Sequence, residues 1–188
     1  LIWRLLTGGA AMTGKTALLI VDLQVAMFES ESDPPIHDAH GLLQRAGDLI
    51  VRARQAGVPV IYVRHDGGPG DPLEAGRPGW DIHPVLEPAP DEVIVEKRAP
   101  DSFYETELGD LLAEQGIEQL VIAGAQTDYC INATCRRAAA LGYDTLLVAD
   151  THSTWGSGGK TAEQIIATYN AELGDLGVRL VPSGAVAF

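Results

Sequence analysis

The stretch Ala17-Leu18-Leu19-Ile20-Val21-Asp22 decides the fold, because it is a short apolar run that ends in a carboxylate. Residues that are apolar at every position, and not only at alternate ones, are typical of a strand buried on both faces, as in a parallel sheet. Similar runs recur along the chain and alternate with segments that have the spacing of amphipathic helices. We therefore predict an α/β domain, a three-layer αβα sandwich with a six-stranded parallel sheet of Rossmann-like architecture.

The same patterns place the other elements of the domain. Strands are expected at residues 17–22, 58–63, 93–95, 120–123, 145–149 and 178–181. Helices are expected over residues 42–53, after a capping box formed by Ser102 and Glu105, over residues 129–142, and after a capping box formed by Thr161 and Gln164. Residues 66–90 are rich in glycine and proline, and a loop of that length is usually a lid or a binding segment.

Composition excludes several classes of protein. The 188 residues include 13 Lys+Arg and 26 Asp+Glu, a formal charge of −13 that disfavours nucleic-acid and anionic-membrane partners. No apolar run approaches the roughly 20 residues that span a bilayer. The two cysteines, Cys130 and Cys135, would lie on different faces of a helix, which is poor geometry for a disulfide. We therefore expect a cytoplasmic protein whose partner is a small-molecule substrate.

The N-terminus contains a pattern that resembles a nucleotide-binding loop. We interpret residues 1–11 as an N-terminal extension or an artificial remnant, and residues 12–188 as a single domain. Gly9 to Thr16 fits the phosphate-loop pattern G-x-x-x-x-G-K-[ST], whose chemistry needs a helix that begins at Lys15. A β-forming run follows instead, so the sequence favours a glycine lead-in to a strand, with a phosphate-loop nucleotide binder as an alternative function.

Reactive side chains follow several of the expected strands. Ligands of open parallel sheets bind beyond the carboxyl ends of the strands, where Asp22, Lys97 and Cys130 fall. A helix start and the Lys97 ammonium would both favour the thiolate of Cys130, and Asp22 could take the thiol proton and return it to a leaving amine. These are the parts of a cysteine hydrolase. The alternative is that Cys130 is a small buried apolar residue, which is our interpretation of Cys135.

Three motifs in order carry a family resemblance. They are Ala17-Leu18-Leu19-Ile20-Val21-Asp22-Leu23-Gln24, then Glu96-Lys97 followed by Asp101-Ser102-Phe103, and then Gly124-Ala125-Gln126-Thr127-Asp128-Tyr129-Cys130. With them the chain resembles the isochorismatase-like cysteine hydrolases, the superfamily of nicotinamidases and N-carbamoylsarcosine amidohydrolases, over residues 16–181.

The resemblance implies a set of catalytic groups. Cys130 would be the nucleophile, Asp22 the general base and acid, and Lys97 a support for both. A non-proline cis peptide is implied between Ala125 and Gln126, with the backbone N–H groups of Gln126 and Cys130 as the oxyanion hole. The resemblance also implies a homo-oligomer, a dimer or a tetramer.

Two departures from related sequences narrow the expected chemistry. Nicotinamidases have an Asp-x-His metal motif after the second strand, whereas this chain has Arg64-His65-Asp66, in which adjacent ligands cannot face one ion. We therefore expect no catalytic metal and no cofactor. Members that cleave isochorismate typically lack the cysteine, so Cys130 favours hydrolysis of an amide or related C–N bond through a covalent intermediate. A non-catalytic member that acts by association is the other alternative.

Several aromatic and polar residues are candidates for substrate binding. We expect this role for Gln24, Phe28, Trp80 and Tyr129, although Gln24 could instead support the loop of Asp22 and Trp80 could anchor the long loop. We leave open whether the pocket is also lined by His65, His83, His152 and Trp155.

Overall fold

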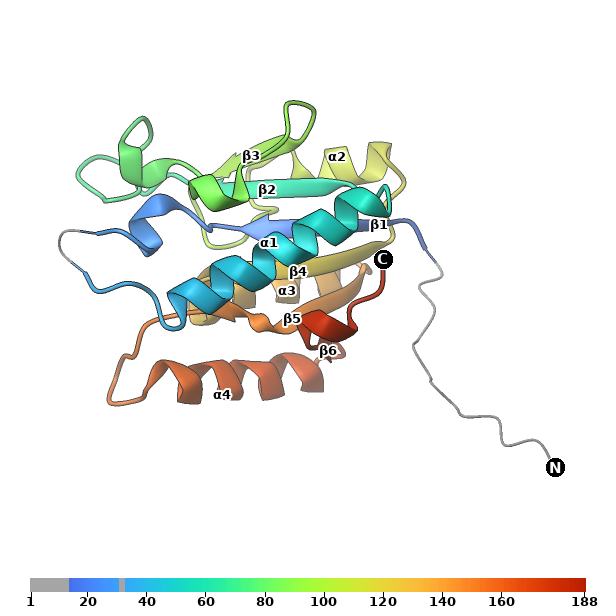
Figure 1. Cartoon of the computed structure of the whole chain (residues 1–188). Coiled ribbons are helices and arrows are strands. Elements are labelled where there is room, and N and C mark those ends of the chain that lie inside the picture. The colour runs from blue at the N-terminus through green and yellow to red at the C-terminus, as the bar shows by residue number, and fades with distance from the viewer. Residues whose placement is uncertain (1–13, 31–32) are drawn as a thin grey trace.

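One parallel sheet organises the molecule (Figure 1). The structure, a computed structural model, describes residues 14–30 and 33–188, so the interpretation of residues 1–11 and the position of Gly9 lie outside the described residues. The six strands are all parallel, in the order β3-β2-β1-β4-β5-β6. The predicted fold class is confirmed.

The strands and helices follow the expected order along the chain. The strands are β1 (Thr16–Val21), β2 (Val60–His65), β3 (Val93–Lys97), β4 (Gln119–Ala125), β5 (Asp144–Ser153) and β6 (Arg179–Val181). The helices are α1 (Ala39–Gln55), α2 (Leu108–Glu114), α3 (Asn132–Ala140) and α4 (Ala162–Asp175). Short 3₁₀ turns occur at Val25–Met27, Pro78–Trp80, Pro84–Leu86 and Ser183–Ala185, and a π-helical turn, Thr127–Ile131, precedes α3.

The sheet is covered on both faces, as its apolar strands require. Along β1, Leu18 and Ile20 pack into the core beneath α1, whereas Leu19 and Val21 pack into the core shared by α2, α3 and α4. Each of these side chains is fully buried, and burial of one such side chain stabilises the fold by roughly 1.5–3 kcal/mol. In residues 14–30 and 33–188, no helix is both long and apolar enough to be a membrane span.

One of the two expected capping boxes is wrong. α2 begins only at Leu108, because the Ser102 hydroxyl is hydrogen-bonded to Thr134 Oγ1 (2.8 Å) and Glu105 has a left-handed backbone with φ of 53°. The other capping box is confirmed, since Thr161 Oγ1 accepts from the Gln164 N–H and Gln164 Oε1 accepts from the Thr161 N–H.

The described part of the phosphate-loop pattern contradicts a nucleotide-binding role. Thr16 begins β1, so a strand and not a helix follows Lys15. The Lys15 ammonium donates to the carbonyl oxygen of Gln115 at 2.7 Å, and the Thr16 hydroxyl lies 2.8 Å from Gln119 Oε1. These residues therefore belong to the amino end of the sheet, opposite the edge where parallel sheets bind ligands.

Candidate active site

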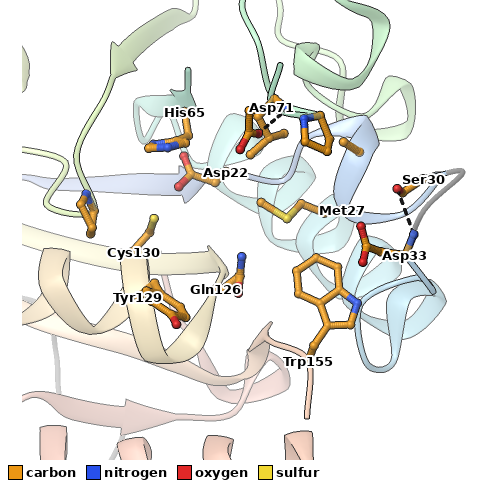
Figure 2. Close-up of a pocket in the computed structure, with 14 residues that line it drawn as sticks. Asp22, Met27, Ser30, Asp33, His65, Asp71, Gln126, Tyr129, Cys130 and Trp155 are labelled. Carbon is orange, nitrogen blue, oxygen red and sulfur yellow. Dashed lines mark hydrogen bonds between the residues drawn. The ribbon is translucent and has the colours of Figure 1, made fainter. Parts of the chain in front are cut away.

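The carboxyl edge of the sheet brings three reactive side chains together, and Figure 2 shows two of them, Asp22 and Cys130. Asp22 follows β1, Lys97 ends β3, and Cys130 lies in the π-helical turn after β4. The Lys97 Nζ atom is 2.8 Å from Asp22 Oδ2 and 3.1 Å from Cys130 Sγ. The carboxylate of Asp22 and the sulfur of Cys130 lie within 4.8 Å of each other. The sequence motifs therefore converge on one site.

The backbone around Asp22 is shaped by a close approach of two strands. Asp22 has a left-handed φ of 52°, and its N–H donates to the Val63 carbonyl oxygen at 2.9 Å. Gly124 on β4 has a φ of 142°, and a Cβ atom there would lie 2.0 Å from the Val21 carbonyl oxygen. Only glycine fits this contact. The peptide bond between Ala125 and Gln126 is cis, as the resemblance implies.

Lys97 is a buried cation surrounded by acceptors. Besides Asp22 and Cys130, its ammonium lies 3.0 Å from the Ala99 carbonyl oxygen and 3.4 Å from His65 Nδ1. Burial alone would lower the pKa of Lys97, but the Asp22 carboxylate and the Cys130 sulfur outweigh it and raise the pKa above its ordinary value. Lys97 is therefore a permanent positive charge at neutral pH.

Potential metal ligands also meet at this point. One ligand atom each from Asp22, His65 and Cys130 lies within 4.8 Å of the others. The Lys97 ammonium is within 3.4 Å of all three side chains and so takes the place that a cation would have between them. Burial lowers the pKa of His65, and the Lys97 charge lowers it further, so this imidazole is neutral at neutral pH.

The thiol of Cys130 differs from the sequence-based expectation. Burial raises its pKa to about 12, the Asp22 carboxylate adds to this increase, and the Lys97 ammonium only partly opposes it. The prediction of a resting thiolate is therefore wrong, because the local effect of a helix start is weaker than burial beside a carboxylate. A base is needed to activate this sulfur.

Asp22 is placed to be that base. Its side chain is fully buried, and Oδ2 is engaged by Lys97. Oδ1 has no hydrogen-bond partner within residues 14–30 and 33–188. A buried carboxylate oxygen without a partner is costly in a folded protein and usually has a functional reason.

A cavity of about 510 Å³ opens over these groups, within the size range of small-molecule sites (Figure 2). It is lined by Asp22, Ala26, Met27, Ser30, Asp33, His65, Asp71, Pro72, Leu73, Pro100, Gln126, Tyr129, Cys130 and Trp155. Among the substrate-binding candidates it thus includes Tyr129, and of the residues left open it includes His65 and Trp155. Lys97 lies behind the lining, against the sulfur.

Three substrate-binding candidates are absent from the described lining of this cavity. Gln24 is buried, and its amide donates to the carbonyl oxygens of His65 (2.9 Å) and Trp80 (2.7 Å). The guanidinium carbon of Arg64 lies over the Trp80 ring, 3.4 Å from the ring centroid. Phe28 packs edge-on against His83, with ring centroids 5.1 Å apart. Gln24 and Phe28 thus hold the segment after β1 to the long loop, and the Trp80 ring packs that loop against Arg64 of β2, which corrects their assignment to substrate contact.

The two other histidines left open, His83 and His152, are not in the described lining; His83 accepts from the Val85 N–H (3.3 Å), and His152 is structural. His152 is buried between the Thr127 hydroxyl (2.8 Å) and Asn170 Oδ1 (2.9 Å). Burial lowers its pKa to about 4, so it stays neutral. His152 thereby ties the π-helical turn that contains Cys130 to α4.

Sequence reasoning missed several lining residues. Met27 and Asp33 lie in the segment after β1, and Asp71 and Leu73 lie in the long loop of residues 66–90. The length of that loop was the available signal, since long ordered loops usually serve a site. Which of its side chains turn inward depends on tertiary contacts such as the Gly67 N–H to Leu73 carbonyl bond (3.1 Å).

Comparisons with known proteins agree with this architecture. The family model described as "Isochorismatase domain" matches residues 16–172. A streptothricin hydrolase from Streptomyces noursei is 38% identical over 78% of this chain, and the match spans only 60% of that relative's length. A ureidoacrylate amidohydrolase from Variovorax paradoxus is 28% identical over 84% of this chain and 75% of its own. The crystal structure of an isochorismatase from Pseudomonas putida superposes with a TM-score of 0.85 at 28% identity, covering 92% of this chain and 90% of that one.

Proposed function

This chain belongs to the isochorismatase family, and we propose that it is a cysteine-dependent hydrolase that cleaves an amide or related C–N bond of a small molecule. The observation that carries the proposal is the contact of one buried ammonium, that of Lys97, with both the Asp22 carboxylate and the Cys130 sulfur at the floor of a cavity. The names of relatives, a hydrolase and an amidohydrolase, support the same reaction class.

The first half-reaction forms a thioester. Asp22 takes the proton of the Cys130 thiol as the sulfur attacks the carbonyl carbon of the amide. The Lys97 ammonium, 3.1 Å from the sulfur, stabilises the negative charge that develops there. Asp22 then returns the proton to the amide nitrogen, the C–N bond breaks, and the amine leaves.

The second half-reaction regenerates the thiol. Asp22 takes a proton from water, and the resulting hydroxide attacks the thioester carbon. The C–S bond breaks, the proton on Asp22 returns to the sulfur, and the carboxylic acid leaves. The sum is one amide and one water converted to one acid and one amine, with the enzyme unchanged.

The backbone after β4 supplies the groups for the charged intermediate. Gln126 and Cys130 both line the cavity, and we assign their N–H groups to the developing oxyanion. The Gln126 carbonyl oxygen accepts from the N–H groups of Tyr129 (3.2 Å) and Ile131 (3.0 Å), and these bonds fix the backbone of the turn. Donors fixed in this way need no reorganisation during the reaction.

Selective alkylation tests the proposal. A panel of small amides that includes streptothricin and ureidoacrylate would first provide an assay by product release. Iodoacetamide should then modify Cys130 much faster than Cys135, which is fully buried in the core, and turnover should fall in step with modification of Cys130. Equal, slow labelling of both thiols, or full labelling of Cys130 with turnover retained, would reject the mechanism.

A further inference from the structure

His65 lines the cavity but takes no part in the two half-reactions. One of its ring nitrogens, one carboxylate oxygen of Asp22 and the sulfur of Cys130 all lie within 4.8 Å of one another. Figure 2 shows His65 next to Asp22 at the reacting end of the cavity. Polar groups that converge on the reacting atoms in this way orient a bound ligand.

The backbone of His65 is held in place from two sides. The His65 N–H donates to Oε1 of the buried Gln24 (2.9 Å), and Gln24 Nε2 donates to the His65 carbonyl oxygen (2.9 Å). On its other side, His65 is paired with Lys97 in the register of β2 and β3. The imidazole is therefore attached to a rigid point at the sheet edge, as a binding residue requires.

The Lys97 ammonium decides which ring nitrogen of His65 carries the proton. The Nζ atom lies 3.4 Å from Nδ1, and an ammonium has donors but no acceptor, so Nδ1 is the unprotonated nitrogen. Burial and the Lys97 charge lower the pKa of His65, so the ring is neutral at neutral pH and carries a single proton. That proton is on Nε2.

The Nε2–H group has no acceptor in the protein. Within residues 14–30 and 33–188, the contact with Lys97 is the only hydrogen bond of the His65 side chain, and it uses Nδ1. The two nitrogens of an imidazole face in widely different directions, so Nε2 faces away from Lys97, which lies behind the cavity lining. An unpaired donor on a residue that lines a cavity can be satisfied by an acceptor on a ligand.

The charge beside His65 decides which kind of acceptor fits. Figure 2 shows Asp71 near His65 and Asp22, and the Asp71 charge acts on the imidazole. Asp71 accepts from the Leu73 N–H (2.8 Å) and forms no ion pair in the described part of the chain, whereas Asp22 is paired with Lys97. Asp71 would repel a negative charge on a ligand at this point. A neutral oxygen is therefore the favoured acceptor.

We propose that His65 is a substrate-binding residue whose Nε2–H donates to a carbonyl or hydroxyl oxygen on the leaving group of the amide. Asp22 returns a proton to the leaving nitrogen and lies within 4.8 Å of a His65 ring nitrogen, which places His65 on that side of the substrate. The inference rests on the proposed function for this orientation. It adds a substrate class, amides whose leaving amine carries a neutral oxygen acceptor close to the nitrogen, in preference to amides with an apolar or anionic leaving amine.

Cyanamides test the inference without a known substrate. The thiol adds across their C≡N bond: the sulfur bonds to the carbon, the thiol proton goes to the terminal nitrogen, and the product is an isothiourea, with no group released. The cyanamide carbon takes the place of the amide carbonyl carbon, and the substituted nitrogen takes the place of the leaving nitrogen. Cyanamides made from glycinamide, glycine and isobutylamine have similar shapes but offer a carbonyl, a carboxylate and no acceptor, respectively.

The measured quantity is the initial rate of adduct formation at Cys130. Rates are followed by peptide mass spectrometry and divided by the rates with free 2-mercaptoethanol, which removes differences in intrinsic reactivity. In the wild type the glycinamide reagent should react about tenfold faster than the isobutylamine reagent, because only the former accepts from His65. It should also react about tenfold faster than the glycine reagent, because Asp71 repels the carboxylate.

Matched variants locate the two effects. His65→Phe keeps a ring but removes the donor, and should bring the glycinamide-to-isobutylamine ratio to within about twofold of one. His65→Gln keeps a donor amide and should retain part of the preference. His40→Phe makes the same change as His65→Phe at an exposed residue of α1 outside the lining, and should keep the wild-type ratio. Asp71→Asn should lower only the glycinamide-to-glycine ratio, by several-fold. Thermal unfolding of each variant shows that it is folded.

The tautomer of His65 has a readout of its own. Long-range ¹⁵N–¹H spectra are recorded on protein labelled in its five histidines, and the His65 signals are assigned by their loss in His65→Gln. At neutral pH they should show a neutral ring that is protonated at Nε2. A ring protonated at Nδ1, or at both nitrogens, would overturn the inference.

The outcomes keep the inference apart from the proposed function. A corrected glycinamide-to-isobutylamine ratio near one in the wild type, or an equal decrease in His65→Phe and His40→Phe, overturns recognition by His65 even if Cys130 forms adducts and is essential for hydrolysis. A glycine reagent as fast as the glycinamide reagent overturns the preference for a neutral acceptor. No adduct at Cys130 with any of the three reagents overturns the inference and the proposed nucleophile together, and hydrolysis that persists after complete alkylation of Cys130 overturns the nucleophile whatever the ratios.

Discussion

The two ends of the central sheet are built in opposite ways. At the amino end, the Thr16 hydroxyl donates to Gln119 Oε1, and the Gln119 amide donates to the Asp144 carboxylate. Arg179 donates to both oxygens of Asp144, each at 3.0 Å. Donors and acceptors in this network are matched to one another, which is the usual arrangement of polar groups that stabilise a fold.

At the carboxyl end the polar groups are incompletely matched. Asp22 has a left-handed backbone and an unpartnered Oδ1, and the neighbouring thiol is a proton donor that the carboxylate could deprotonate. The contrast shows that the polar groups at the amino end of the sheet stabilise the fold, whereas those at the carboxyl end are arranged for reaction. Substitutions at one end should therefore change the free energy of unfolding, and those at the other should mainly change turnover.

The largest expected effect is at the sulfur. Cys130→Ala removes the nucleophile and should lower kcat/KM by at least about 10⁴-fold with little change in thermal stability. Cys135→Ala is the matched control, because this buried thiol packs in the core beneath α3. It should cost about 1–2 kcal/mol of unfolding free energy and keep turnover. Similar turnover in the two variants would remove the distinction between the cysteines.

The next effect concerns the buried ion pair. Lys97→Met leaves the Asp22 charge without its partner and should lower the unfolding free energy at neutral pH by about 3–5 kcal/mol, measured by urea denaturation. The double variant Asp22→Asn/Lys97→Met removes both charges and should regain most of that loss. A single variant as stable as the wild type would show that the pair is not coupled.

The pH dependence of stability has a defined sign for this pair. The folded pKa of Lys97 is raised above its ordinary 10.5, so its contribution is fully present below that pH and is lost as pH rises through the folded value. Unfolding free energy should therefore fall above about pH 10 in the wild type and fall less in Asp22→Asn/Lys97→Met. Parallel curves for the two proteins would contradict the assignment.

A smaller effect separates thiol reactivity from catalysis. The Asp22 carboxylate helps to raise the pKa of Cys130 to about 12, so Asp22→Asn should increase the thiolate fraction. Iodoacetamide labelling at about pH 9 should then become several-fold faster, roughly up to tenfold, while hydrolysis is lost because no base remains. Slower labelling together with lost hydrolysis would mean that Asp22 mainly positions the thiol.

The smallest effect is expected at the amino end. Thr16→Val keeps the side-chain shape but removes the hydroxyl that donates to Gln119. It should lower the unfolding free energy by about 1–2 kcal/mol and leave kcat/KM unchanged. A decrease in kcat/KM of tenfold would show that the two ends of the sheet are not independent.

Much of the fold could be predicted because its determinants are local. The apolar run of β1 requires cover on both faces, and the Thr161–Gln164 capping box depends only on residues three apart. The positions of Asp22, Lys97 and Cys130 at strand ends followed from parallel topology alone. The capping box predicted at Ser102 does not form, because the Ser102 hydroxyl is hydrogen-bonded to Thr134, a residue 32 positions away. Contacts between residues so far apart limit what the local sequence can predict.

The properties of the site depended on tertiary structure. A helix start indicates a lowered thiol pKa, but burial and the position of Asp22 raise it, and neither is visible in the local sequence. The side chains of Phe28 and Trp80 looked suitable for substrate contact, yet they pack against His83 and Arg64. The path of a long loop decides which aromatic residues face a cavity.

The most direct test of the account is a crystal structure with the aldehyde analogue of the best hydrolysed amide. The account predicts a covalent bond from Cys130 Sγ to the aldehyde carbon, with the oxygen facing the N–H groups of Gln126 and Cys130. An aldehyde bound in the cavity without a bond to sulfur, under conditions where it inhibits turnover, would contradict the claim that Cys130 is the nucleophile.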